Sequence, residues 1–377
     1  MDIKTLIENR MDEIKRLREE LHGCPEIAFN EFKTQEVIKR VLDGLNIGHT
    51  DCAKTGVVGV LNSGEECIAV RADMDALPVN GMSHACGHDY HMAVVLGTAM
   101  VLKDMGFDKC VKFVFQPAEE NVGGALPMIK EGVLENPKVK CIIGCHVWPN
   151  IEIGKVAVAE GPSMAAVDHF SIQFKGVGGH AATPHLCKNP LYPAIALIEN
   201  MNNKSRMEYN ALNSHIISFA SLNAGSIFNV IPEVAEIKGT VRTFDENLRK
   251  RIYEDMIKTA ELSAEIYGCT IEPDYRLDYP ALFNDGQLVN EFIKSSRDIL
   301  GHKNVLSLEK SFAAEDFSYY AQRVPAVHFR LGICDGVKGT HPLHSPKFDV
   351  AEDAIYYGIC AMVNFVIRIA DNWKNVH

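Results

Sequence analysis

The chain has 377 residues, of which 47% are hydrophobic and 23% charged, and its formal net charge is −11. This composition excludes disordered and fibrous classes, and the length predicts two domains, because one core rarely organises so many residues. The negative charge argues against nucleic acid and anionic membranes as partners, since both bind basic patches. Eleven cysteines without a recognisable secretory signal indicate reduced thiols and a cytoplasmic location.

Helical and strand patterns alternate in the first part of the chain. Apolar spacing predicts amphipathic helices over Asp2–His22 and Glu31–Leu45. The apolar run Met92–Leu102 predicts a buried helix that is too short to cross a bilayer. Short strands are predicted at Gly56–Leu61, Cys67–Arg71, Val111–Phe115 and Val139–Cys145. Such alternation is typical of an α/β domain.

The pattern changes in the middle of the chain. Strands are predicted at His169–Phe174, Ser214–Leu222, Glu233–Phe244 and Thr270–Tyr275, and helices at Leu191–Asn202 and Glu246–Tyr267. This order predicts a ferredoxin-like α+β unit. The last segment returns to helix, strand and helix, at Gly286–Leu300, Ala326–Leu331 and Ala351–Ala370. We therefore expect an α/β domain with a mixed sheet, formed by residues 1–167 and 279–377, with a second domain inserted at residues 168–278.

Polar clusters follow the apolar strands of the α/β domain, where open sheets of this class place their ligand sites. A fifth cluster lies near the C-terminus. In chain order the clusters are Arg71-Ala72-Asp73-Met74-Asp75, His84-Ala85-Cys86-Gly87-His88-Asp89, Gln116-Pro117-Ala118-Glu119-Glu120, Cys145-His146-Val147-Trp148-Pro149 and His341-Pro342-Leu343-His344-Ser345-Pro346.

Two of these clusters carry residue types suited to metal chemistry. Cys86 and His88 offer a thiolate and an imidazole, which suit zinc, manganese, cobalt or nickel better than magnesium or calcium. Alone, such a pair is more often a buried thiol beside a hydrogen-bonded histidine. Glu119 and Glu120 at a strand end favour ligation, because one carboxylate can bind a metal while its neighbour acts as a general base, although an isolated acidic pair is usually a solvated turn.

Together the motifs resemble the M20 metallopeptidase family. The matching strings are Arg71-Ala72-Asp73-Met74-Asp75-Ala76-Leu77-Pro78, Ala85-Cys86-Gly87-His88-Asp89, Gln116-Pro117-Ala118-Glu119-Glu120, His146-Val147-Trp148-Pro149 and His344-Ser345-Pro346, with Pro25-Glu26 and Ala314-Glu315-Asp316-Phe317 towards the two ends. Within the family the chain is most similar to the amidohydrolase branch of hippurate hydrolases, indole-acetyl-amino-acid hydrolases and N-acetyldiaminopimelate deacetylases. The resemblance implies a catalytic α/β domain interrupted by a smaller dimerisation or lid domain, and a homodimer.

The resemblance also implies roles for individual residues of the catalytic domain. Two divalent metal ions are expected, Mn²⁺ or Zn²⁺ first and Co²⁺ or Ni²⁺ next, with Cys86 as the bridge between them. Glu119 would be the general base, and Asp73 would hold the imidazole of His88 in its ligating tautomer. The ligands that the resemblance implies are Cys86, His88, Glu120, His146 and His344.

In the inserted domain, the resemblance implies that His180 stabilises the oxyanion, in some relatives from the dimer partner. Asn229 and Arg242 would contact the substrate carboxylate. Glu315 is expected near the metal site. The segment Ala76–Ala85 is shorter than in relatives, which predicts a different pocket shape.

Other residues next to the motifs are expected to be bystanders. We interpret His84 as a loop residue and His91 as part of a helix surface. His344 is preferred to His341 as the last ligand, because the resemblance lies in the His-Ser-Pro string. Cys145 is expected to point away from His146, because successive side chains of a strand alternate between faces.

The sequence therefore predicts a hydrolase that cleaves small N-acyl amino acids to a carboxylic acid and a free amino acid. An N-acetyldiaminopimelate deacetylase and a dipeptidase or carboxypeptidase of the same family remain alternatives. A non-catalytic metal or thiol sensor is the alternative from another class. Glu119 favours catalysis over sensing, because a sensor needs no free base beside a ligand.

Overall fold

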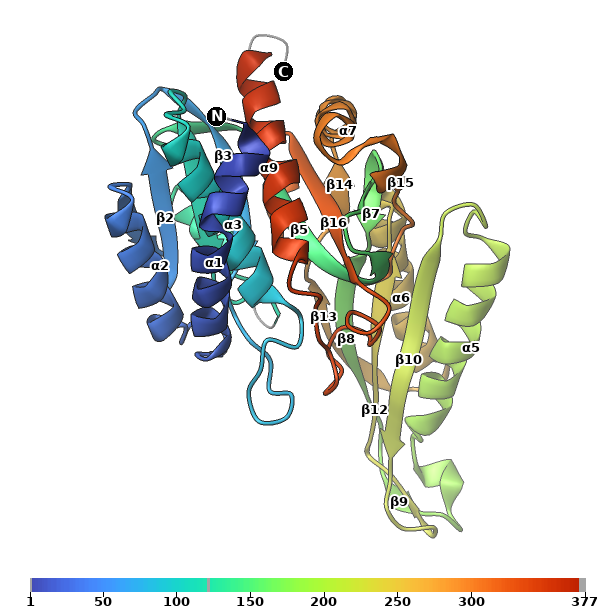
Figure 1. Ribbon diagram of the computed structural model, residues 1–377. Coiled ribbons are helices and arrows are strands. Elements are labelled where there is room, and N and C mark those ends of the chain that lie inside the picture. Colours follow the sequence, from blue (N-terminus) through green and yellow to red (C-terminus); the bar gives the residue numbers. More distant parts are fainter. Residues whose placement is uncertain (1, 121–122, 373–377) are drawn as a thin grey trace. The chain divides into compact units, whose positions relative to one another are not determined.

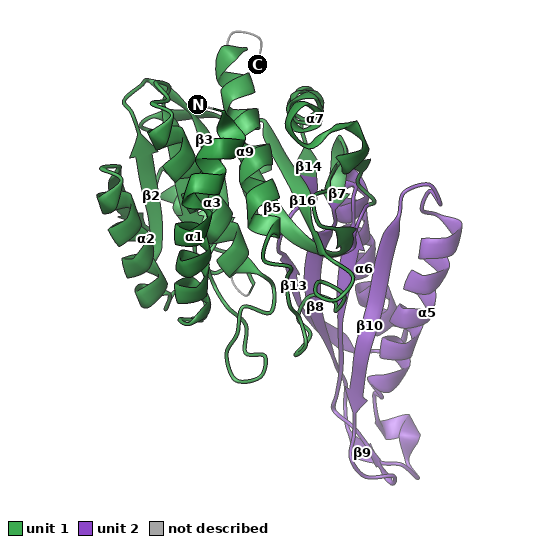
Figure 2. Cartoon of the chain, viewed as in Figure 1, with its two compact units in different colours: residues 1–163, 283–309, 316–377 green, residues 164–282, 310–315 purple. Residues whose placement is uncertain are grey.

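The computed structural model describes residues 2–120 and 123–372. The chain forms two compact units, which Figure 2 shows in different colours. The first contains Met1–Ser163, Phe283–Glu309 and Asp316–His377, and the second contains Met164–Leu282 and Lys310–Glu315. The second unit begins and ends four residues outside the expected insertion, and it takes up a short additional segment at residues 310–315.

The first unit is built on a mixed sheet in the order β1-β2-β4-β3-β5-β16-β6-β15 (Figure 1). The strands β4, β3, β5 and β16 run parallel to one another, whereas β2 is antiparallel to both β1 and β4, and β6 is antiparallel to β16. The predicted α/β class with a mixed sheet is thus confirmed. The strands are β1 (Gly48–Cys52), β2 (Gly56–Leu61), β3 (Glu66–Asp73), β4 (Val111–Gln116), β5 (Lys138–Glu152), β6 (Val156–Val158), β15 (Val305–Ser307) and β16 (Ala326–Cys334).

Helices cover this sheet, and the largest apolar core lies beneath them. Apolar residues of α1, α3, α7 and α9 pack with one face of β3, β5 and β16 in a single cluster. The helices of the unit are α1 (Ile3–His22), α2 (Phe32–Gly44), α3 (His88–Asp104), α4 (Ala125–Lys130), α7 (Gly286–Leu300), α8 (Ser318–Ala321) and α9 (Ala354–Asp371), with a 3-10 turn at His302–Asn304.

Two of these helices, α3 and α9, are largely apolar, as is typical of helices buried in a protein core. Fifteen consecutive residues of α3, from His88 to Leu102, are buried, which explains why its sequence shows no polar face. The closing helix α9 is long and apolar enough to span a membrane by length and composition alone, but 67% of it is buried within the protein. Its apolar character is therefore explained by packing on the core.

One strand extends well beyond its predicted end. β5 continues from the predicted Val139–Cys145 to Glu152, because its second half pairs with β16, where Trp148 lies opposite Gly332. His146 and Trp148 thus belong to a strand rather than to a loop. Both side chains lie on the face opposite Cys145 and Val147, which pack in the core under the helices.

The second unit is an antiparallel sheet in the order β10-β12-β8-β13. Phe170, Ile172 and Phe174 of β8 are buried against α5 and α6, while the residues between them are less buried. The main elements are β8 (Ala166–Lys175), α5 (Leu191–Met207), β10 (His215–Ala224), β12 (Val234–Thr243), α6 (Glu246–Ile266) and β13 (Thr270–Leu277). Shorter elements of this unit are β9 (Gly179–His180), a 3-10 turn at Pro184–Leu186 and β11 (Val230–Ile231). Two further strands, β7 (Gly161–Met164) and β14 (Leu282–Asn284), pair with each other, and most of their residues belong to the first unit.

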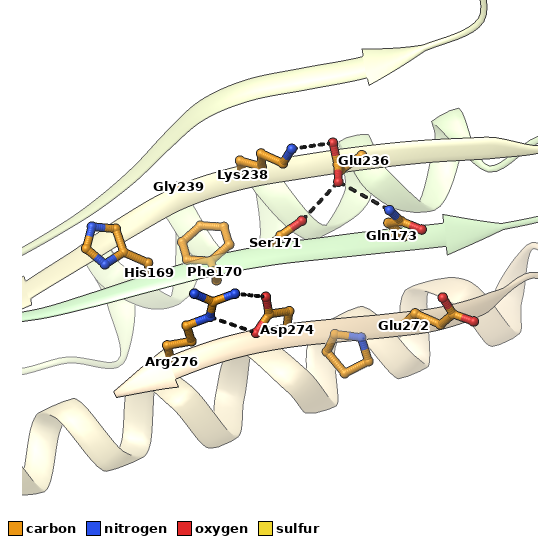
Figure 3. Close-up of a pocket in the computed structure, with 11 residues that line it drawn as sticks. His169, Phe170, Ser171, Gln173, Glu236, Lys238, Gly239, Glu272, Asp274 and Arg276 are labelled. Atoms are coloured by element: carbon orange, nitrogen blue, oxygen red, sulfur yellow. Dashed lines mark hydrogen bonds and ion pairs between the residues drawn. The ribbon is translucent and has the colours of Figure 1, made fainter. Parts of the chain in front are cut away.

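The other face of this sheet is polar and carries a hollow of about 740 Å³ (Figure 3). Its cations are paired with carboxylates of the same face: Lys238 with Glu236 and Arg276 with Asp274, both at 2.8 Å. These ion pairs are solvent-exposed. The hollow therefore presents charges that are already neutralised by their neighbours.

Candidate metal centre

The five predicted metal ligands lie together in the first unit, although they come from four separate segments. Cys86 precedes α3 and His88 is its first residue, Glu120 follows β4, His146 lies on β5, and His344 is in the loop before α9. The Cys86 sulfur is 3.4 Å from Nε2 of His146 and 3.2 Å from Nε2 of His344. Glu120 Oε1 lies 3.1 Å from His344 Nε2 and 3.8 Å from His88 Nε2.

The donor atoms fall into two sets of three that share Cys86. Cys86, His88 and His146 form one set, and Cys86, Glu120 and His344 form the other, each with its donor atoms within 4.8 Å of one another. Sulfur and nitrogen ligands of one tetrahedral zinc ion stand about 3.6 Å apart, given usual bond lengths. The Cys86–histidine distances are close to this value, so the arrangement fits two ions with one thiolate between them.

The imidazoles are held with their Nε2 atoms available as ligands. His88 Nδ1 is 2.9 Å from the Asp75 carbonyl oxygen and His146 Nδ1 is 2.7 Å from the Val147 carbonyl oxygen, so each Nδ1–H donates to the backbone. In the neutral form of each ring, Nε2 then carries the lone pair, as metal ligation requires. Within residues 2–120 and 123–372, the buried Nε2 of His88 has no hydrogen-bond partner. A cation would satisfy this atom.

The contacts of Asp73 differ from the expectation. Its carboxylate is 3.8 Å from His88 Nδ1 but 2.6 Å from Nδ1 of His91. The backbone of Asp75 takes the predicted role, because α3 presents His88 to the carbonyl that follows β3 rather than to the end of the strand itself. Asp73 is instead connected to the site through its hydrogen bond with His91.

His91 is also not the surface residue that was expected. It is fully buried, and its Nε2 accepts a hydrogen bond of 2.9 Å from the Val147 backbone nitrogen. The chain Asp73–His91–Val147 thereby ties β3, α3 and β5 together beside His146. The signal in the sequence was the spacing: His91 is three residues after His88, so the two share a face of the helix.

Asp75 links the predicted metal ligands to the predicted base. Its two carboxylate oxygens accept hydrogen bonds of 3.1 Å from the backbone nitrogens of Glu119 and Glu120, while its carbonyl orients His88. The loop is held from its other side by buried Glu31, which accepts a 3.0 Å bond from Ala118 N. Ala118 has a φ of 58°, an uncommon value for a residue with a side chain. These contacts set the position of Glu119.

A buried polar network supports the same strand ends. Arg71 donates to Asp73 at 2.8 Å and to Asp316 at 3.0 Å, and Gln116 Nε2 donates to Asp316 at 2.8 Å. Burial alone would raise the pKa of Asp73, but His88, His91 and Arg71 lower it well below its usual value. Sequence reasoning singled out Glu315 in this segment and overlooked Asp316. Glu315 itself is buried, within the 310–315 segment of the second unit.

Gly87, between the two first ligands, has a backbone conformation that glycine adopts readily. Its φ is +83°, and a Cβ at this position would stand 2.4 Å from Cγ2 of Val147. The turn therefore brings Cys86 and the start of α3 directly against β5. This close approach places the thiol beside His146.

The electrostatics of the site predict that metal binding displaces protons. Burial, followed by Glu120 and Glu119, raises the pKa of the Cys86 thiol well above its usual value. Burial alone would lower the pKa of His88, but Asp73, Asp75 and Glu120 raise it to about 10. Burial lowers the pKa of His146 to about 3, so this ring is already neutral at pH 7.

At pH 7, therefore, Cys86 and His88 carry protons that they must lose to become ligands, and we expect about two protons to be released on metal binding. Metal affinity should accordingly rise as pH rises through neutrality. Calorimetric titration of the protein with metal, in buffers of different ionisation enthalpy, measures this number. A binding enthalpy that does not depend on the buffer would contradict the expectation.

The predicted substrate residues of the second unit do not lie together. His180 pairs with Val230, and Ala181 N donates to Asn229 O at 3.0 Å, so His180 and Asn229 are neighbours beyond one end of the sheet. Arg242 lies near the other end of β12, eight residues from Val234, or roughly 27 Å at the usual strand rise. Its guanidinium contacts the Phe312 carbonyl at 3.2 Å. One chain therefore cannot bring Asn229 and Arg242 to the same small carboxylate.

Comparisons with known proteins agree with this geometry. The model of peptidase family M20/M25/M40 matches residues 69–368. An N-acetylcysteine deacetylase of Bacillus subtilis is 36% identical over 357 residues, covering 90% of this chain and 92% of that protein. An IAA-amino acid hydrolase of Arabidopsis thaliana, ILR1-like 2, is 32% identical over 375 residues, covering 95% of this chain and 85% of that protein.

A solved structure is similar along the whole chain. The YXEP protein of Bacillus subtilis, described as a dinuclear metal binding peptidase from the M20 family, superposes with a TM-score of 0.83. It is 32% identical in sequence, and the match covers 97% of this chain and 99% of that one.

Proposed function

Because the chain belongs to peptidase family M20/M25/M40, as its motifs predicted, we propose that it is a metal-dependent hydrolase of N-acyl amino acids. It cleaves the amide bond and releases a carboxylic acid and a free amino acid. The observation that carries this proposal is the pair of three-atom donor sets sharing Cys86, with the buried carboxylate of Glu119 directly beside Glu120.

The donor set fits two divalent ions of intermediate softness. One set offers sulfur and two nitrogens, and the other offers sulfur, nitrogen and oxygen. Such mixed ligands suit manganese, zinc, cobalt or nickel, and we propose Mn²⁺ or Zn²⁺ as the ions used. When bound, the ions would polarise the amide carbonyl and lower the pKa of a water molecule.

Glu119 is suited to the role of general base. Only 6% of the residue is exposed, and Asp75 holds its backbone, so its carboxylate has a defined position next to the ligands. It takes a proton from the attacking water and delivers it to the leaving nitrogen, which avoids expelling an amide anion. Glu120, held by the second oxygen of Asp75, remains a ligand.

We propose that the enzyme works as a homodimer in which two chains complete one site. In this arrangement Arg242 of one chain, and His180 and Asn229 of the other, act on the same substrate. The separation of these residues within one chain supports the idea. β10 is an edge strand of ten residues with exposed Ile216, a type of edge that can pair with a second copy. Sedimentation that shows only monomer at micromolar concentration would overturn the dimer.

The physiological partner is proposed to be a small molecule rather than nucleic acid or a membrane, and the location to be cytoplasmic. The net charge of −11 supports the first part, because polyanions repel such a surface. An N-acetyldiaminopimelate deacetylase and a dipeptidase share the catalytic residues proposed here. They differ from the leading proposal only in the substrate that fills the pocket.

The test combines metal stoichiometry with a substrate panel. Protein stripped by a chelator is reloaded with Mn²⁺ or Zn²⁺, and hydrolysis of hippurate, N-acetyl amino acids, N-acetyldiaminopimelate and free dipeptides is measured. We expect activity to saturate at about two ions per chain and to favour N-acyl amino acids. Absence of turnover on every substrate with every metal would overturn the proposal, and a preference for dipeptides would replace it by the peptidase alternative.

A further inference from the structure

Arg330 lies beside the metal centre, on the same face of the large sheet. It stands opposite His146 in the parallel pairing of β16 with β5, so the two side chains share one face. Its guanidinium carbon is 3.6 Å from the centre of the Trp148 ring. That ring in turn meets His146 edge to face, with centroids 5.9 Å apart. The indole of Trp148 therefore contacts both Arg330 and the proposed metal ligand His146.

The guanidinium is buried, but only part of it is hydrogen-bonded. Arg330 is 6% exposed, and Nη1 donates to the Glu309 carbonyl oxygen at 2.8 Å. Its Nε and Nη2 atoms are buried and have no hydrogen-bond partner in the part of the chain that the structure describes. Burying charged donors unpaired costs free energy. An arginine with a purely structural role would have these donors satisfied.

Nε and Nη2, which have no partner among the described residues, form one edge of the guanidinium. Other arginines of this protein use that edge to hold carboxylates. Arg10 donates from Nε and Nη2 to the two oxygens of Asp104, at 2.7 and 2.8 Å. Arg276 donates from the same two atoms to Asp274, at 3.2 and 2.8 Å. This planar pair of N–H groups matches a carboxylate bidentately. At Arg330 it is aligned by the Trp148 stack and has no protein carboxylate among the described residues.

We propose that Arg330 binds a carboxylate of the substrate next to the metal centre, and that it thereby determines which acyl amino acids are accepted. The inference rests on the proposed function, since the ligand is a substrate of that site. The group that Arg330 binds is in either case a carboxylate close to the amide bond that is cleaved. It comes either from the α-carboxylate of the amino acid or from a second carboxylate on the side chain or acyl group.

The kinetic test uses Arg330→Met, which keeps much of the apolar stem, and Arg330→Lys, which keeps the charge without the fork. Matched substrate pairs are N-acetyl-L-glutamate with N-acetyl-L-glutamine, and N-acetyl-L-methionine with its amide. In Arg330→Met we expect KM for the preferred substrate to rise about 10- to 100-fold with little change in kcat, as for lost uniform binding. Arg330→Lys should restore part of the loss. Arg323→Met, an exposed arginine of the same unit, is the control.

The two pairs separate the sources of the carboxylate. If only the preference for glutamate over glutamine disappears in Arg330→Met, the fork binds a second carboxylate. If only the preference for free N-acetyl-L-methionine over its amide disappears, the fork binds the α-carboxylate. Unchanged KM values for all four compounds would overturn the proposal. A structural role predicts that Arg330→Met melts at a lower temperature with KM unchanged, whereas our proposal predicts an equal or higher melting temperature with KM raised.

A binding measurement keeps this inference separate from the proposed function. In metal-loaded Glu119→Gln protein, N-acetyl-L-glutamate and N-acetyl-L-methionine are added, and the rise in melting temperature is compared with that of Glu119→Gln/Arg330→Met. Loss of the rise in the double variant supports carboxylate binding by Arg330 even if wild-type protein hydrolyses nothing. An equal rise in both proteins, or no rise in either, overturns the inference even if hydrolysis is normal.

Discussion

Replacing Glu119 by Gln is expected to lower kcat by about 10²- to 10⁴-fold while both metal ions remain bound, the range for removal of a general acid–base catalyst. The amide keeps the size of the side chain but cannot accept a proton from water. The ligands Cys86, Glu120 and His146 stay in place, because Asp75 holds the loop through backbone nitrogens that the substitution does not touch. Metal content by mass spectrometry and steady-state kinetics on the best substrate measure the effect.

Glu135→Gln is the matched control, since Glu135 is an exposed glutamate of the same unit, and it should behave as wild type. Retention of full activity by metal-loaded Glu119→Gln would contradict the assigned base and favour a different proton acceptor. Loss of metal together with activity would show instead that Glu119 is a ligand.

Replacing Cys86 by Ala is expected to weaken the binding of both metal ions at once. Its sulfur belongs to both donor sets, so each ion is left with two of its three side-chain donors. Substituting residues that merely support a ligand typically costs about 10- to 100-fold in metal affinity or activity, and a shared ligand should cost more. Titration with Mn²⁺ or Zn²⁺, followed by activity at each ratio, measures the loss. We expect no step at which one ion binds with wild-type affinity.

Cys334→Ser provides the control for loss of a thiol, because Cys334 is a partly exposed free cysteine of the same unit. The bridging role would be contradicted if Cys86→Ala bound one ion as tightly as wild type. In that case Cys86 would serve a single ion. Folding of the variant is checked by comparing its melting temperature with that of the wild type in the presence of the chelator. Neither protein then holds metal, so the comparison reports folding alone.

Patterns local in the chain were read correctly from the sequence. The helix predicted at Gly286–Leu300 and the strand at Gly56–Leu61 have those bounds in the structure, because apolar spacing and flanking glycine or proline act over a few residues. The family could be recognised for a related reason. Cys86, Glu119, Glu120 and His146 occur in short strings whose residue types express the chemistry directly.

Features that depend on packing between segments distant in the chain could not be predicted from local sequence patterns. Such patterns placed His91 on a helix surface and predicted that Asp73 holds the His88 imidazole. Both predictions were wrong because sequence patterns carry no information on how α3 approaches β3 and β5. The extension of β5 through Trp148 also depends on a partner strand, β16, almost two hundred residues later in the chain.

The division of the five donors into two sets around Cys86 has the same origin. So does the fork of Arg330, whose Nε and Nη2 have no hydrogen-bond partner within residues 2–120 and 123–372. Each is a relation between side chains from different strands and loops, and its distances are set when the sheet and the helices pack together. Residue types and local order thus established the kind of chemistry that this protein performs. The tertiary structure decided which atoms meet, because hydrogen bonds and metal ligation are lost when distances change by more than a few tenths of an ångström.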